Sequence, residues 1–338
     1  MDITENIFFP QKKSLPLELI IEVIGEDLEK VDQEFRKNLK SEVSIISTIG
    51  EHLLFSGGKR FRPILVLLSS KLCGYRGTKH IAMASLVEFI HTATLLHDDV
   101  VDKAEIRRGV VSANSIWGND ACVLVGDFLF TKSFSLMVDN GDWKILKAIS
   151  TATTLMAEGE IEELVRTNDL SITEETYLSI IFKKTASLIS AATQIGAILG
   201  NVSVEEEKAL YEFGKKVGMA FQLIDDKLDY TSNEEEFGKK IGIDLQEGKI
   251  TLPLIIAYQR CNEDEKRFIH NTIESEIITK DIFLEIVKII ETYGGIDHTW
   301  KKANQYIEEA KKYLEIFPNS IEKQALLGLA DYVLERKL

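Results

Sequence analysis

The stretch LLHDDVVDKAEIRRG, which runs from Leu95 to Gly109, passes from apolar residues through three aspartates to a pair of arginines. It lies inside a segment without proline that extends from Ile64 to Leu252 and is rich in alanine, leucine, isoleucine, glutamate and lysine. A proline-free segment of this composition favours one helix after another. Because strict alternation of apolar and polar residues is scarce along the chain, we expect an all-α fold.

Apolar residues recur with helical spacing over much of the chain, and we expect roughly a dozen helices. The long ones are predicted near residues 79–102, 113–138, 143–169, 174–200 and 204–231. Glycine, asparagine and serine mark the breaks, at residues 56–58, 74–78, 107–112, 140–142, 233–248 and 294–295. No linker or internal repeat divides the chain, so residues 1–338 are predicted to form a single domain, with residues 1–15 as a flexible N-terminal arm.

The composition excludes several classes of protein. With 45% hydrophobic and 28% charged residues, the chain is globular, and its formal charge of -14 argues against a broad nucleic-acid-binding surface. Three distant cysteines, an odd number, favour a reducing compartment over disulfide bonds. The acidic start does not resemble a signal peptide, and the longest apolar run, Thr185–Val202, is too polar for a membrane span. We therefore expect a cytoplasmic protein without a membrane span.

Two aspartate clusters share the spacing D-D-x-x-D, namely Asp98, Asp99 and Asp102, and then Asp225, Asp226 and Asp229. Residues four apart in a helix lie on one face, so the first and last carboxylates of each cluster are neighbours. Such carboxylates repel one another unless a cation neutralises them, and oxygen ligands suit Mg²⁺. A solvated acidic face is the alternative for one cluster, but each follows a strongly apolar run. Facing each other across a bundle, the two clusters could hold Mg²⁺ between them.

Positive charge gathers near these aspartates. Lys59 and Arg62 lie at the start of a helix that follows a glycine break, where the helix dipole disfavours cations. Arg107 and Arg108 follow the first aspartate cluster in a polar turn. A bound anion would resolve the conflict, since helix N-termini and arginine side chains both suit phosphate. An exposed basic loop is the alternative.

Other polar residues occupy apolar surroundings. His91 lies two helical turns before the first cluster, on nearly the same helix face. The alternative is a core histidine that binds no ligand, which is more common on an apolar helix. Lys184 and Thr185 begin an apolar helix, where a buried lysine needs an anionic partner. After the second cluster, a glycine-containing loop carries Lys239 and Lys249 and could close on phosphate, or could be a plain surface loop.

Taken in order along the chain, these motifs resemble those of the all-trans prenyl diphosphate synthases, most closely the long-chain polyprenyl type. The matching segments are GGKRFRP (57–63), FIHTATLLHDDVVD (89–102), RRG (107–109), LVGDFLF (124–130), KT (184–185), QLIDDKLDY (222–230) and GKITLP (248–253). They span most of the chain, and no motif of the family is missing. The resemblance implies a single large helical bundle of the isoprenoid synthase type with a central cavity.

The resemblance also implies a Mg²⁺-dependent activity, with Asp98, Asp102 and Asp225 as the expected metal ligands. Isopentenyl diphosphate would be condensed repeatedly onto an allylic diphosphate, farnesyl or geranyl diphosphate, to give a long-chain, about octaprenyl, diphosphate for quinone side chains. A homodimer and transient membrane contact during product release are further expectations. The residues expected on the allylic side are Asp98, Asp99, Asp102, Arg107, Lys184, Thr185, Gln222, Asp225 and Asp226, all catalytic except Thr185 and Gln222. Those expected to bind isopentenyl diphosphate are Lys59, Arg62, His91 and Arg108, and Lys239 and Lys249 are expected on phosphate.

Product length in this family depends on residues just before the first aspartate cluster, where bulky side chains stop the growing chain. Here the fifth and fourth residues before Asp98 are Ala93 and Thr94, both small, so an open tunnel and a long product are expected. Phe134 or Met137, on the following helix, is expected at the tunnel floor. Close helix packing is the alternative reason for a small residue at Ala93.

Other classes of protein remain to be weighed. A helical metal phosphohydrolase could use His91, His97 and Asp98, but would leave the second cluster and the lysine loop without a task. A terpene cyclase would need only the first cluster. A shorter-chain, geranylgeranyl-type synthase and the catalytic subunit of a heteromeric synthase both fit the same motifs and stay open.

Overall fold

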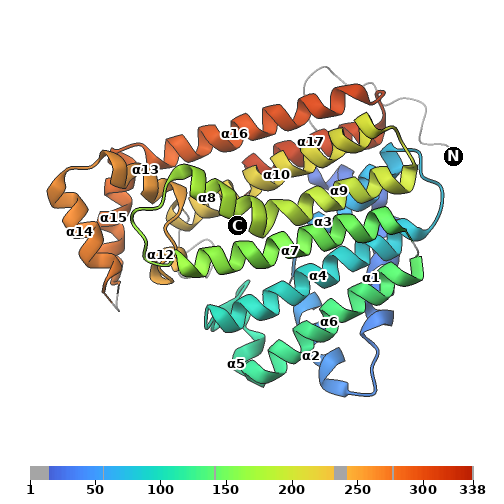
Figure 1. The fold of residues 1–338 in the computed structure, drawn as a ribbon, viewed down its shortest axis with the longest axis horizontal. Helices are drawn as coiled ribbons and strands as arrows, with labels where there is room; N and C mark the ends of the chain where they lie inside the picture. The colour runs from blue at the N-terminus through green and yellow to red at the C-terminus, as the bar shows by residue number, and fades with distance from the viewer. Residues whose placement is uncertain (1–14, 56, 141, 232–241, 276–277, 337–338) are drawn as a thin grey trace.

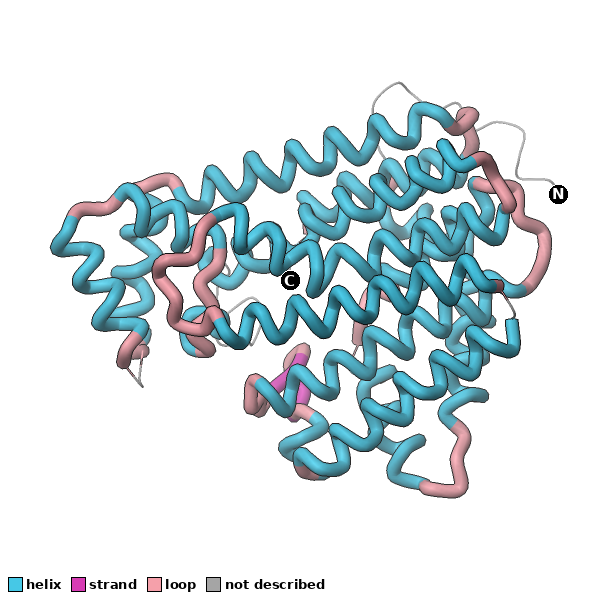
Figure 2. Tube along the Cα trace, in the orientation of Figure 1, coloured by secondary structure: helices cyan, strands magenta, loops and turns pink. Residues whose placement is uncertain are grey.

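The computed structural model describes residues 15–55, 57–140, 142–231, 242–275 and 278–336. In this part of the chain, the only strands are β1 (Ile106–Arg107) and β2 (Val110–Val111), which pair antiparallel beside an otherwise helical structure (Figure 2). The predicted all-α class is therefore confirmed.

The helices of this part are α1 (Leu17–Leu39), α2 (Ser44–Phe55), α3 (Phe61–Leu72), α4 (Lys79–Val101), α5 (Ala113–Trp117), α6 (Asn119–Asn140), α7 (Trp143–Val165), α8 (Glu174–Ile181), α9 (Ser187–Gly200), α10 (Val204–Thr231), α12 (Ile243–Gln246), α13 (Leu252–Arg260), α14 (Glu263–Ile273), α15 (Lys280–Thr292), α16 (Gly295–Tyr313) and α17 (Ile321–Glu335). A π-helical turn, η1 (Phe182–Ala186), joins α8 to α9, and a 3₁₀ turn, η2 (Leu314–Ile316), follows α16.

The long helices form one bundle. The helix α10 packs against α9 and α16, α9 packs against α3, and α4 packs against α3 and α6. These helices run side by side in Figure 1, and the shorter α13, α14 and α15 gather at one end. Between the layers, Phe35 of α1 stacks on Phe89 of α4 with ring centroids 4.2 Å apart, an arrangement that adds to the gain from burial. Nearly all of α9 is buried, as expected of a core helix.

The predicted long helices agree well with the observed ones, with two interruptions. The helix predicted over residues 113–138 is divided into α5 and α6 at Gly118, where φ is +83° and glycine is favoured. The helix predicted over residues 174–200 is divided by η1. Neither interruption contains proline, so the pattern of apolar residues continues across both of them.

Asp27 of α1 ties three helices together. Its carboxylate lies 2.8 Å from Lys71 Nζ of α3 and 3.3 Å from His80 Nε2 of α4. Burial would raise the pKa of Asp27, but the hydrogen bonds from Lys71 and His80 outweigh burial and lower the pKa to about 2. An unfolded aspartate has a pKa of roughly 4, so this cluster stabilises the fold above that pH.

The helix α6 is apolar along most of its length, yet much of it faces solvent. Its residues Asn119–Asp139 are long and apolar enough to cross a membrane, and it is the one helix of the described ranges with that property. However, 39% of the most apolar 18-residue stretch of this helix is buried inside the bundle. The side chains of Leu124 and Val138 are among the most exposed, at 67% and 72%. Exposed apolar faces often mark a surface that contacts another molecule.

Candidate active site

A cavity of about 1120 Å³ lies among α4, α6, α7, η1, α10 and α17. It exceeds the roughly 300–1,000 Å³ of ordinary ligand clefts, so it suits a large substrate. On α4 and α7 the lining residues recur every three or four positions, which is the spacing of one helical face. Of the predicted site residues, those that line the cavity are Lys59, Arg62, His91, Thr94, Asp98, Arg107, Arg108, Lys184, Thr185, Gln222 and Asp225.

Basic side chains gather where the loop before α3 meets α4. The Nε of Arg62 is buried and has no hydrogen-bond partner in the described structure. Burial lowers the pKa of Arg62 to about 10, so this side chain stays charged near neutral pH. Burial, followed by the charge of Arg62, lowers the pKa of His91 well below its usual range, so the imidazole is neutral. Glu88 is already paired with Arg60 at 3.0 Å, and a charged donor without a partner suits an anion.

Arg108 reaches this region from the hairpin between β1 and β2. The two turn residues, Arg108 and Gly109, have φ of +52° and +79°, as a two-residue type I′ turn requires. Such a conformation is uncommon for arginine and is worth relating to function. The turn directs the Arg108 side chain to the carbonyl oxygen of Gly57, to which it donates a hydrogen bond. Two loops that are distant in sequence therefore meet at the basic end of the cavity.

The carboxylates of the first aspartate cluster have different surroundings. Asp98 lines the cavity, and burial raises its pKa to about 7. Asp99 is completely buried and pairs with Arg107. Asp102, just after α4, lies 3.1 Å from Lys249 Nζ. Of these three carboxylates, the one that lines the cavity is therefore Asp98.

In the second cluster, too, one carboxylate lines the cavity and the middle one is buried. Asp225 lines the cavity and pairs with Arg336, at the end of α17. Asp226 is buried and its carboxylate faces the protein, where Oδ1 accepts a hydrogen bond from Gln222 Nε2 at 2.7 Å and Oδ2 accepts one from the Tyr177 hydroxyl. The middle aspartate of each cluster is thus held by donors of the protein itself.

The contacts of the two middle aspartates separate them from the cavity in this structure. Asp99 and Asp226 do not line it, and a protein side chain donates to each carboxylate, so their predicted action on the substrate stays a prediction. Asp229, the last member of the second cluster, accepts hydrogen bonds from the backbone N–H groups of Ile243 and Asp244 at 3.2 and 3.1 Å. Helical spacing predicts which residues are neighbours, but tertiary partners decide which of them reach the cavity.

Lys184 has the anionic partners that its burial requires. Its Nζ lies 2.9 Å from Glu160 and 2.7 Å from Glu163, both on α7. Burial would lower the pKa of Lys184, but the two carboxylates outweigh burial and raise the pKa above its usual range. Lys249 also contacts carboxylates, with its Nζ 2.8 Å from Glu247, and does not line the cavity. Lys239, a predicted phosphate ligand, lies outside the described residues. So do residues 1–14 of the predicted N-terminal arm.

The π-turn η1 presents Lys184 and Thr185 to the cavity. Turns of this kind are short departures from the α-helix and often occur at functional sites. On the facing helix α7, a Cβ added to Gly159 would lie only 2.7 Å from the backbone nitrogen of Lys184. Glycine at this position therefore allows α7 and η1 to approach closely.

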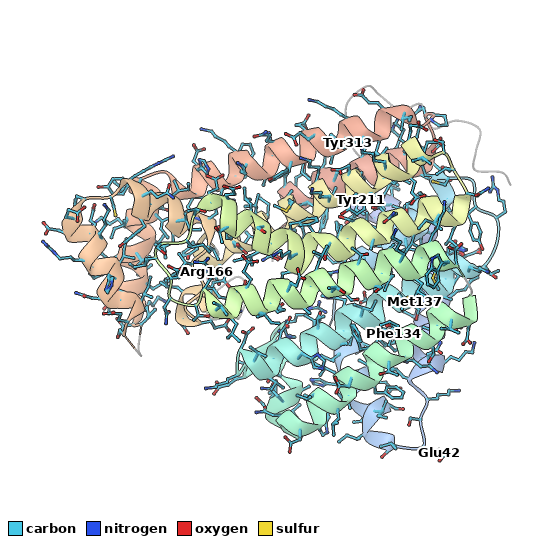
Figure 3. The ribbon with its side chains drawn as sticks, viewed as in Figure 1. Glu42, Phe134, Met137, Arg166, Tyr211 and Tyr313 are labelled. Atoms are coloured by element: carbon cyan, nitrogen blue, oxygen red, sulfur yellow. The ribbon has the colours of Figure 1, made fainter. Side chains whose placement is uncertain are left out.

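The residues predicted to set product length lie differently from expectation. Thr94 lines the cavity, whereas Ala93 is completely buried and is not among the lining residues. Phe134 and Met137 lie in the second half of α6 (Figure 3). Neither residue lines the cavity. One turn before Phe134, Phe130 does, with its ring centroid 5.5 Å from that of Phe134. Phe130 rather than Phe134 is therefore the aromatic residue of α6 that faces the cavity.

Several residues around the cavity were not predicted from the sequence. Glu160 and Glu163 could have been found, because they are an acidic pair three residues apart after an apolar run, which is the same signal as the aspartate clusters. Tyr177 and Arg336 carry no such signal, since their aspartate partners lie on another helix far along the chain.

In the described part of the chain, no group of three or more His, Cys, Asp and Glu side chains is arranged as a complete metal site. Asp98 and Asp225 nevertheless line one cavity. Mg²⁺ is commonly held by one or two carboxylates together with substrate phosphates, rather than by a cage made only of protein ligands. The arrangement therefore suits a cation that arrives with a phosphorylated substrate.

Comparisons with known proteins identify the family of the chain. The model of the polyprenyl synthetase family matches residues 43–290. The chain is 40% identical over 320 residues to octaprenyl diphosphate synthase from Escherichia coli, which covers 95% of this chain and 99% of that protein. It is also 40% identical over 318 residues to a geranyl-diphosphate-specific all-trans-nonaprenyl-diphosphate synthase from Rhodobacter capsulatus, with 94% and 97% of the two chains covered.

A solved structure is similar over the whole bundle. The polyprenyl synthase from Caulobacter crescentus, complexed with calcium and isoprenyl diphosphate, has a TM-score of 0.92 and 40% identity, with 97% of this chain and 100% of that chain covered. These similarities favour none of the other classes considered from the sequence, and use of magnesium is typical of the family. The chain therefore belongs to the polyprenyl synthetase family and is an all-α, long-chain trans-prenyltransferase.

Proposed function

We propose that the protein condenses isopentenyl diphosphate repeatedly onto an allylic diphosphate and releases a long-chain polyprenyl diphosphate. The observation that carries this proposal is a single cavity lined both by the cations Lys59 and Arg62 and by the carboxylates Asp98 and Asp225. Cationic side chains suit a diphosphate directly, whereas carboxylates suit one that is bound through divalent cations. A reaction that joins two diphosphate substrates needs both kinds of site.

Mg²⁺ fits the carboxylate end of the cavity. Burial raises the pKa of Asp98 to about 7, which indicates that its charge lacks a sufficient partner. We assign Asp98, Asp102 and Asp225 to Mg²⁺, which when bound neutralises the leaving diphosphate. To bind Mg²⁺, Asp102 would give up its ion pair with Lys249, and Asp225 would give up its ion pair with Arg336. The Caulobacter crescentus relative was solved in complex with calcium and isoprenyl diphosphate, which supports a divalent cation in the proposed reaction.

The side chains beside these carboxylates are assigned to the allylic diphosphate. Arg107 and Lys184 line the cavity, and fixed cations there stabilise the charge that grows as the C–O bond breaks. The allylic carbon then becomes positive and must be shielded from water. Apolar cavity residues such as Phe130 and Met156 exclude water around it. Lys239 and Lys249 are proposed to approach the phosphate groups when the substrates bind.

The basic end of the cavity is assigned to isopentenyl diphosphate. Lys59, Arg62, His91 and Arg108 line it, and the unpartnered Nε of Arg62 is a donor for a diphosphate oxygen. The double bond of the bound substrate attacks the allylic carbon, forms a C–C bond and becomes positive in turn. Loss of a proton to the departing diphosphate restores a double bond, so the protein needs no serine or cysteine nucleophile.

The decisive experiment supplies purified protein with farnesyl diphosphate, isopentenyl diphosphate and Mg²⁺ and separates the products by chromatography. Asp98→Ala should lower turnover by about 10²-fold, as expected when electrostatic stabilisation is removed. Asp297→Ala is the control, because Asp297 is an exposed residue of α16 that pairs with Lys301. Full turnover in excess chelator, or in Asp98→Ala, would contradict the proposal.

We further propose a product of about octaprenyl length that serves as a quinone side chain. The support is the 40% identity to octaprenyl diphosphate synthase from Escherichia coli. A nonaprenyl relative is equally similar, so chromatography must resolve these lengths. A predominant product of geranylgeranyl length would instead support the shorter-chain alternative.

A homodimer is also proposed. The support is a set of exposed apolar side chains on two helices beside the cavity, Leu124 and Val138 on α6 and Ile161 and Leu164 on α7. Ile161 and Leu164 also line the cavity, so a partner subunit would cover its open side. Monomers at micromolar concentration in sedimentation experiments would contradict this. We further propose one cytoplasmic domain that contacts the membrane only during product release.

A further inference from the structure

A chain of hydrogen bonds runs from α8 to the wall of the cavity. The Tyr177 hydroxyl donates to Oδ2 of Asp226, and Oδ1 of Asp226 accepts from Nε2 of Gln222 at 2.7 Å. In turn, Oε1 of Gln222 accepts from the hydroxyl of Thr185 at 2.8 Å. Tyr177 and Asp226 are each 4% exposed, whereas Gln222 and Thr185 line the cavity. Two buried groups that do not line the cavity are thus linked to two that do.

This chain fixes the direction of the Gln222 amide. Both carboxylate oxygens of Asp226 accept hydrogen bonds, Oδ2 from the Tyr177 hydroxyl and Oδ1 from the Gln222 amide nitrogen, so the amide oxygen of Gln222 faces Thr185. A reversed amide would set its carbonyl oxygen against the carboxylate. Tyr177 contributes by occupying Oδ2, which leaves Oδ1 of Asp226 for Gln222.

The direction of the amide matters if the proposed function holds, because the allylic carbon becomes positive in this cavity. An amide oxygen at the wall stabilises that charge, whereas an amide NH₂ group would destabilise it. The hydroxyl hydrogen of Thr185 is used by Gln222, so Thr185 also presents only lone pairs to the cavity.

We propose that Tyr177 is a positioning residue of the prenyl transfer. It acts through Asp226 to keep the oxygen atoms of Gln222 and Thr185 directed at the reacting carbon. This inference rests on the proposed function. It also gives the middle aspartate of the second cluster a task other than binding a metal.

Tyr177→Phe removes one hydrogen-bond donor and keeps the ring. We expect kcat to fall about tenfold, the equivalent of one hydrogen bond, while KM for both diphosphates changes less than about twofold. Tyr293→Phe is the matched control, because its hydroxyl also donates to a carboxylate, Glu265 Oε2, at 2.6 Å, outside the cavity. An equal loss of kcat in Tyr293→Phe would overturn the proposal. Loss of any tyrosine–carboxylate hydrogen bond would then lower kcat, whether or not the bond is linked to the cavity.

A double-mutant cycle separates positioning from a merely structural role. If Tyr177 acts through Gln222, then Tyr177→Phe should cost no further activity in a Gln222→Leu background. A tenfold loss in both backgrounds refutes the positioning role, even when the wild-type protein is active. No prenyl transfer by the wild-type protein would instead refute the proposed function itself. If Tyr177→Phe fails to fold, Asp226→Asn enters the same cycle, because asparagine has one acceptor oxygen where aspartate has two.

Discussion

Replacing Gly159 by alanine would test how closely the π-turn η1 is held against α7. The new Cβ would lie 2.7 Å from the backbone nitrogen of Lys184, and ordinary contacts begin at 3.4 Å, so the backbone must move by about 0.7 Å, the difference between these distances. Overpacking of this kind costs about 1–3 kcal/mol, whereas exchanging glycine for alanine within a helix gains about 1 kcal/mol. The free energy of unfolding should therefore fall by only about 0–2 kcal/mol.

Activity should suffer more than stability in Gly159→Ala. A misplacement of about 1 Å in groups that position a substrate can cost about 10²-fold, so we expect kcat to fall about 10–100-fold. Gly25→Ala is the matched control, because Gly25 is also inside a helix but a Cβ there would meet nothing within 4 Å. Urea unfolding and steady-state kinetics measure the two effects. If Gly159→Ala is as active as Gly25→Ala, close packing of η1 is not what holds Lys184 in place.

Three further outcomes follow from the contacts. Arg62→Ala should raise KM for isopentenyl diphosphate about tenfold or more. Arg107→Ala should raise KM for the allylic diphosphate instead and should also lower the melting temperature. If either variant changed both KM values equally, the two substrates would not have separate pockets. Asp27→Asn should lower the melting temperature at pH 7, and the gap should close as the pH falls from about 4 to about 2, because the folded-state pKa is depressed and its contribution is lost on protonation; a constant gap would count against the ion cluster. Phe130→Ala should lengthen the product, as measured by chromatography, while Phe134→Ala should not. The reverse result would show that the growing chain passes Phe134 and not Phe130.

The sequence could predict features that depend on local chemistry. The helix predicted over residues 204–231 agrees with α10 because its apolar spacing is unbroken and no proline interrupts it. Asp98 and Asp225 could be placed at a common site because each ends an apolar run that only a buried helix face explains. These inferences needed no knowledge of which helices are neighbours.

Other features depend on contacts between distant segments. Asp99 and Asp226 look no different in sequence from the aspartates before them, and the folded partners Arg107 and Tyr177 turn them away from the cavity. Phe130 could not be preferred to Phe134 because α6 is apolar on most of its faces, so periodicity does not fix which side meets α4.

The turn η1 has a consequence for how this segment can change during evolution. An α-helix advances by roughly 100° per residue, and a π-turn accommodates one residue more than an α-helical turn would. Deleting one residue within Phe182–Ala186 would let α8 continue into α9 as a regular helix with both ends in their present register. Such a one-codon deletion would leave the register of α8 and α9 unchanged, but Lys184 would rotate by roughly 100° relative to one of these helices and leave the carboxylates of α7. The length of this turn is therefore as much a part of the site as the residues within it.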